Sequence, residues 1–206
     1  HFNKTILERY QRERGPFMKF SEDGLWEMRA NQLKKEIKIG DEYEHLSVNT
    51  DIKPFQEKTI IRSKNLSELY KKGQQLMFDY MHGNKPLKEI FDLNILAKYY
   101  AIIDITRAYH GIFWHNQRFY YNPESEKLET IGFDGYNETG SDNMSVPFIG
   151  FNLALDIDEN EIFFSNIFKD YEFVEYYIKY LTQFCEQEYL NGFISFIKKD
   201  LNNRKE

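Results

Sequence analysis

The sequence has 206 residues and a formal net charge of −6 at pH 7, from 33 acidic and 27 basic side chains. A net-acidic chain without a basic stripe argues against nucleic acid as a partner, because phosphate binding needs clustered Lys and Arg. Aromatic residues make up 17% of the chain, which excludes a disordered protein. The single cysteine, Cys185, excludes a disulfide framework, and no apolar run is long enough to span a bilayer.

The length predicts a single domain over residues 1–206. His1 stands in a helical pattern where a start methionine would be expected, so we expect this domain to be the C-terminal part of a larger chain. Its first segment, residues 1–62, is predicted to contain helices and a linker. The elements expected there are a helix over 2–13 ended by Gly15-Pro16, a short strand over 16–20, a helix over 23–37, and an irregular stretch over 40–58.

A second segment, residues 63–136, carries the strongest helical patterns. The first predicted helix spans 63–83, with Ser63 or Asn65 as its N-cap and apolar residues on one face. Asp92 is the predicted N-cap of the next helix, which continues to about Tyr109. Its apolar residues cover more than one stripe, which indicates a largely buried helix.

The hydrophobic period then changes to that of strands. Residues 116–121 and 127–133 predict a β-hairpin, because the linker 122–126 has turn chemistry. A Gly-, Asn- and Ser-rich loop follows over 135–145. The last segment, 137–206, is predicted to hold this loop and two helices after Asp170, separated near Asn191-Gly192. The fold class expected is mainly α with a small β-hairpin element (α+β).

Polar residues cluster around this hairpin. The buried helix is followed by a loop with His110 and Asn116, and the hairpin leads to Asp134 and Gly135. Asn116 and Asp134 are 18 residues apart, a distance that two short strands and a turn can span. Protein kinases order a catalytic loop, a metal-binding Asn, two strands and a metal-binding Asp in this way. The same two residues could also be ordinary turn and cap residues.

Several of these features together resemble the CotH kinase family, atypical kinases associated with bacterial spore coats and found widely beyond them. The resemblance covers residues 1–20 and 90–136. It rests on the apolar helix, a Gly-bearing loop with His115-Asn116, the aromatic strand Phe119-Tyr120-Tyr121, a hydrophobic residue before Asp134, and the opening His1-Phe2-x-Lys4-x-x-Leu7-Glu8 with Arg14-Gly15-Pro16.

The resemblance implies the helical lobe of an atypical protein-kinase-like fold and transfer of phosphate from ATP to Ser or Thr of a protein substrate. It implies that Asn116 and Asp134 hold Mg²⁺ and, through it, ATP. The family's catalytic Asp falls at His110, where this chain has no acid, so an inactive relative (a pseudokinase) is also implied. The nucleotide-binding Lys and phosphate-covering loop are expected upstream of His1, and residues 1–206 alone are expected to bind ATP weakly.

Three alternatives accompany this interpretation. A neutral His110 could accept the hydroxyl proton, or Asp104 could be a displaced base, although an ion pair with Arg107 three residues later favours a structural role for Asp104. The lobe could instead be a non-catalytic binding module for a surface or coat partner in an exported assembly. A weaker possibility is a metal-dependent hydrolase with His110, His115 and Asp134 as ligands.

Overall fold

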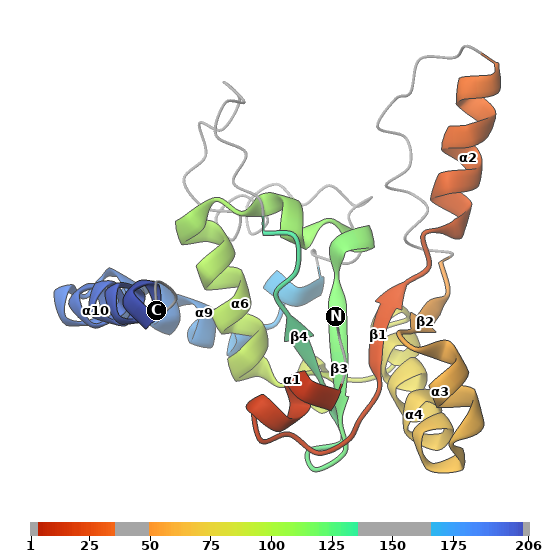
Figure 1. The fold of residues 1–206 in the computed structure, drawn as a ribbon, viewed down its shortest axis with the longest axis horizontal. Helices are drawn as coiled ribbons and strands as arrows, with labels where there is room; N and C mark the ends of the chain where they lie inside the picture. Colours follow the sequence, from red (N-terminus) through yellow and green to blue (C-terminus); the bar gives the residue numbers. More distant parts are fainter. Residues whose placement is uncertain (1–3, 36–49, 136–165, 204–206) are drawn as a thin grey trace.

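The computed structural model describes residues 4–35, 50–135 and 166–203 (Figure 1). The chain is mainly helical and contains one four-stranded antiparallel sheet in the order β2-β1-β3-β4. The strands are β1 Phe17–Phe20, β2 Ile52–Pro54, β3 Arg118–Asn122 and β4 Lys127–Ile131. An α+β class is therefore confirmed, with a sheet larger than the predicted hairpin.

The sheet joins the first two segments of the chain. β1 pairs with β3, with Met18 opposite Phe119, and its other edge pairs with β2. All five residues of β3 are buried, as expected for a central strand. The β3–β4 hairpin forms as predicted, and the side chain of Asn122 accepts a hydrogen bond from the Glu124 amide at 2.9 Å in its turn.

Three long helices begin at side-chain caps. Ser63 caps α4 (Lys64–Met81), Asp92 caps α6 (Leu93–Thr106), and Asp170 caps α9 (Tyr171–Cys185). In each, the cap oxygen accepts a hydrogen bond from a first-turn amide. The remaining helices are α1 Lys4–Arg9, α2 Asp23–Lys34, α3 Glu57–Arg62, α5 Leu87–Ile90, η2 Tyr109–Ile112, η3 Trp114–Asn116 and α10 Gln187–Asn203.

The core lies between the sheet and helices α4, α6 and α9. Aromatic rings fill much of it and meet edge to face, as Tyr100 does with Phe173 at 5.9 Å between ring centroids. Phe20 of β1 likewise meets Phe119 of β3 at 6.1 Å. α10 extends away from this core (Figure 1), and all of its apolar side chains are exposed.

Some predicted boundaries were wrong. The stretch 40–58 was expected to be irregular, but its described part contains β2 and the start of α3. α6 ends at Thr106 because Arg107 adopts a left-handed conformation with φ 54°. The C-terminal helices separate at Glu186, whose backbone is extended, and α10 continues through Asn191-Gly192. Beyond residue 135, the predicted loop over 135–145 lies outside the described residues.

None of the helices in the described ranges is both long enough and apolar enough to cross a membrane.

Candidate functional site

The predicted site residues lie beyond the C-terminal end of α6, beside the start of β3 and the end of β4. The chain turns at Arg107 and passes through η2 and η3. The Tyr99 hydroxyl donates to the Gly111 carbonyl at 2.8 Å, and Gln117 Nε2 donates to the Ile112 carbonyl at 2.7 Å. Side chains from α6 and from the loop itself therefore fix the backbone of this loop.

His110 contacts both predicted metal-site residues. Asn116 Nδ2 donates to the His110 carbonyl at 2.9 Å. On its other side, His110 Nε2 lies 3.3 Å from Asp134 Oδ2. Asn116 is buried, whereas the Asp134 side chain is 49% exposed. His110 thus contacts both Asn116 and Asp134.

The donors at this point suit Mg²⁺ in their chemistry. The side-chain nitrogen of Asn116 donates to the His110 carbonyl, so the side-chain oxygen of Asn116 is the atom that could bind a cation. Asp134 adds a carboxylate that is accessible to solvent. Mg²⁺ prefers such hard oxygen donors and commonly keeps several water molecules with only one or two protein ligands. The oxygen atoms of Asn116 and Asp134 are thus of the donor type that Mg²⁺ prefers.

A zinc site is not supported by the geometry. Within the described part of the chain, no group of three or more His, Cys, Asp or Glu side chains could hold a metal ion. His115, the third proposed ligand, stacks on Phe113 with ring centroids 5.9 Å apart and meets Trp114 edge-on. Burial lowers the pKa of His115.

Asp104, the alternative base, is enclosed in the interface between α6 and α9. It is 2% exposed, and the hydroxyl of Tyr177 on α9 donates a hydrogen bond to its carboxylate. Burial, together with the nearby Asp104 charge, raises the pKa of Tyr109, which also bonds this carboxylate. Arg107, which the sequence suggested as the ion-pair partner of Asp104, is exposed at the end of α6. These contacts favour a structural role for Asp104.

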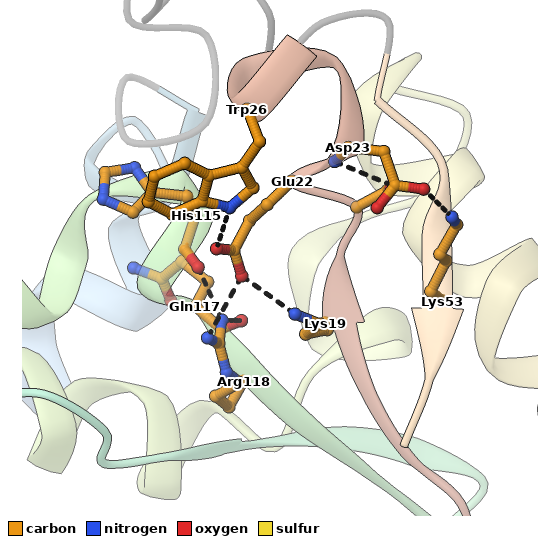
Figure 2. A network of polar contacts seen from close by, with 9 residues as sticks. Lys19, Glu22, Asp23, Trp26, Lys53, His115, Gln117 and Arg118 are labelled. Atoms are coloured by element: carbon orange, nitrogen blue, oxygen red, sulfur yellow. Dashed lines mark hydrogen bonds and ion pairs between the residues drawn. The ribbon is translucent and has the colours of Figure 1, made fainter. Parts of the chain in front are cut away.

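Two charged residues that the sequence did not single out, Glu22 and Arg118, lie beside His115 (Figure 2). Glu22, at the N-cap of α2, accepts hydrogen bonds from Lys19 Nζ at 2.9 Å and from Trp26 Nε1 at 3.3 Å. Its Oε1 also lies 3.5 Å from Nη2 of Arg118, the first residue of β3. The one sequence signal was an arginine opening an otherwise aromatic strand.

The charge states of this pair follow from their surroundings. Burial disfavours ionisation of Glu22, but the hydrogen bonds from Lys19 and Trp26 and the charges of Lys19 and Arg118 outweigh it, so the pKa of Glu22 is lowered. Burial lowers the pKa of Arg118, whose guanidinium nevertheless keeps its charge, as arginine does in proteins generally. Glu22 is therefore an ionised tie between α2 and β3, and its lone pairs are engaged.

The aromatic residues near the hairpin divide between core and surface. Trp114, Phe119, Tyr120 and Tyr121 are buried, so they pack the core and offer no ring to a planar ligand. Phe133 is 38% exposed, and its ring centroid lies 4.3 Å from the Arg118 guanidinium carbon. Four of these five rings therefore belong to the core.

Comparisons of this chain with protein-family models, with curated proteins and with solved structures found no match.

Proposed function

We propose that residues 104–135 form the phosphotransfer site of a CotH-like atypical protein kinase, or of an inactive relative of one. The observation that supports this most is the position of His110, which contacts Asn116 through its carbonyl and Asp134 through its imidazole. In this proposal the chain forms the helical lobe of a kinase-like fold, and its substrate is Ser or Thr of another protein. Asn116 and Asp134 would hold Mg²⁺, which neutralises charge on the phosphates of ATP.

The contact with Asp134 gives His110 a defined chemical role. When Nε2–H donates to the Asp134 carboxylate, the lone pair of the neutral imidazole is on Nδ1. Nδ1 would then accept the proton of the acceptor hydroxyl as that oxygen attacks the γ-phosphorus of ATP and the bond from this phosphorus to the bridging oxygen breaks, which releases ADP. The carboxylate would orient the ring and stabilise the imidazolium that forms, as an acid does behind a catalytic histidine.

The test is phosphotransfer from labelled ATP by the full-length protein, in Mg²⁺ and in Mn²⁺. His110→Ala should reduce the rate by about a hundred- to ten-thousand-fold, the range for removing a general base. Asp134→Asn should abolish metal-dependent activity. His82→Ala is the matched control, because His82 is an exposed histidine on the C-cap of α4, outside the site. An unchanged rate in His110→Ala would refute this assignment.

A binding module without catalysis is the second candidate, favoured by the absence of a carboxylate at position 110 itself. It predicts that the unmutated protein transfers no phosphate under either metal, while Mn²⁺ still binds in an Asp134-dependent way. Phosphotransfer above background by the unmutated protein would exclude it.

A further inference from the structure

Arg118 is a buried cation at the edge of the candidate site (Figure 2). Its Nη1 donates to the carbonyls of His115 at 2.6 Å and Gln117 at 3.0 Å, and Nη2 lies 3.5 Å from Glu22 Oε1. These contacts hold the guanidinium plane in one orientation. They do not use all of its hydrogen-bond donors, because the Nε of Arg118 is buried with no hydrogen-bond partner among the described residues. A buried cation is costly at such a position, which points to a compensating contact elsewhere.

That contact is with Phe133, the residue directly before Asp134. The guanidinium carbon lies 4.3 Å from the Phe133 ring centroid, within the range of a cation–π interaction. The Phe55 ring is farther from the same guanidinium, at 5.7 Å. The backbone carbonyls of His115 and Gln117 orient the Arg118 guanidinium, and the Phe133 ring packs against that oriented guanidinium.

The backbone of Phe133 meets a second fixed surface at Gly111, the residue directly after His110. A Cβ atom at Gly111 would lie only 3.1 Å from the Phe133 carbonyl oxygen, so the absence of a side chain permits this approach. Asp134 itself has φ 49°, a left-handed conformation that aspartate adopts more readily than most residues. The Phe133–Asp134 segment is thus held from both sides.

We infer that Arg118 is a positioning residue: its stack on Phe133, with the bare backbone of Gly111 opposite, holds the Asp134 carboxylate beside His110. The polar contacts of Arg118 are with His115, Gln117 and Glu22, so it acts on the position of Asp134 through Phe133, in addition to the attraction between the Arg118 and Asp134 charges. The importance of this contact for metal binding rests on the proposed function, whereas the placement of Asp134 by Arg118 does not.

The test compares Arg118→Lys and Phe133→Leu with the unmutated chain by NMR. Lysine keeps the charge but lacks the planar fork, and leucine keeps an apolar side chain but lacks the ring. In both variants the nuclear Overhauser contact between the His110 ring protons and the Asp134 β protons, which reports the approach of these two side chains, should be lost. Paramagnetic broadening by Mn²⁺ should show an affinity for the site lowered by about 10- to 100-fold, the usual effect of disturbing the support of a metal ligand.

Phe55→Leu is the matched control, because it removes the more distant ring over the same guanidinium. It should leave both the Overhauser contact and the Mn²⁺ affinity unchanged. Retention of the contact in Phe133→Leu would overturn the inference, including in the case that Arg118→Lys fails to fold. If the contact is lost in both variants but Mn²⁺ does not bind the unmutated protein, the positioning role stands and the proposed metal site fails.

Discussion

The Asp104 carboxylate shows how a buried acid can be confined to structure. It is enclosed by α9, where the Tyr177 hydroxyl donates to it. Removing that hydroxyl takes a donor from a buried charge, so Tyr177→Phe should lower the free energy of unfolding by about 1–3 kcal/mol. Urea denaturation measures this change, and Tyr171→Phe, an exposed tyrosine on the same helix, is the control. Equal stability of the two variants would show that Tyr177 contributes nothing to holding Asp104.

A second buried acid, Glu129 of β4, should make stability depend on pH. Asn122 Nδ2 donates to its carboxylate at 2.7 Å, and Arg12 lies 3.0 Å away. Burial is the largest influence and raises the pKa of Glu129 above its usual 4.5, although Asn122 and Arg12 lower it. The folded state therefore binds the proton more tightly than the unfolded state. Proton binding at Glu129 therefore stabilises the folded state. This contribution is complete below about pH 4.5 and is lost as the pH rises through the pKa of Glu129 in the folded state.

Comparison with Glu129→Gln isolates this contribution, because glutamine does not titrate. The stability of the unmutated chain relative to this variant should fall as the pH rises from 4.5, measured by urea unfolding at several pH values. Glu126→Gln is the control, because Glu126 is exposed and its hydrogen bond with Lys72 lowers its pKa. The stability of the unmutated chain relative to this variant should rise with pH, the opposite trend. A rising relative stability would mean that the Arg12 ion pair dominates over burial.

At the scale of elements, the approach of the N-terminal segment to the sheet depends on one glycine. A Cβ atom at Gly15 would lie 2.1 Å from the Tyr121 carbonyl oxygen and 2.8 Å from the Tyr120 ring. The neighbouring Pro16 carbonyl accepts a hydrogen bond from the Tyr121 amide at 3.0 Å, so the segment cannot shift without losing it. Gly15→Ala should therefore destabilise the fold by about 1–3 kcal/mol through overpacking.

Gly192 provides the contrasting case within α10. A Cβ atom there would meet nothing within 4 Å. Gly192→Ala should consequently stabilise the chain by up to about 1 kcal/mol if α10 unfolds with the rest, since alanine favours a helix over glycine. Thermal or urea unfolding of the two alanine variants should give shifts of opposite sign, and a destabilised Gly192→Ala would indicate a contact at this helix face.

Local patterns predicted the elements that local chemistry determines. The caps Ser63 and Asp92 and the turn at Asn122 were identifiable because each bonds to an amide two or three residues away. β2 was missed because it has only three residues and is defined by pairing with β1, from which residues 21–51 separate it in the sequence. The order of strands in the sheet likewise depends on contacts between distant segments.

The same distinction separates the site residues that were predicted from those that were not. His110, Asn116 and Asp134 lie on a loop and a hairpin that follow one another directly, so their proximity could be expected from their order. Glu22 meets Arg118 only because β1 pairs with β3, and no local pattern contains that pairing. A single sequence therefore gave the loop of the site but not the ion pair that supports it.

At the scale of the whole molecule, α10 differs from every other long helix because none of its described residues is buried. Its apolar side chains are 37–68% exposed, namely Tyr189, Leu190, Phe193, Ile194, Phe196, Ile197 and Leu201. The helix contacts α9 at its start, where Tyr189 meets Phe184 with ring centroids 4.8 Å apart. The core formed by the sheet, α4, α6 and α9 is complete without it.

A chain ending at Glu186 should therefore retain its cooperative unfolding transition, with a free energy within about 0.5 kcal/mol of the full chain, the usual range for changes away from the core. It should also associate less in sedimentation experiments, because a contiguous exposed apolar surface promotes association. A chain ending at Asp170 is the contrasting truncation: it removes α9 and the buried rings of Phe173 and Tyr177, and should not fold. If the chain ending at Glu186 also fails to fold, α10 must pack against another part of the protein in solution, and its apolar face is then part of the core.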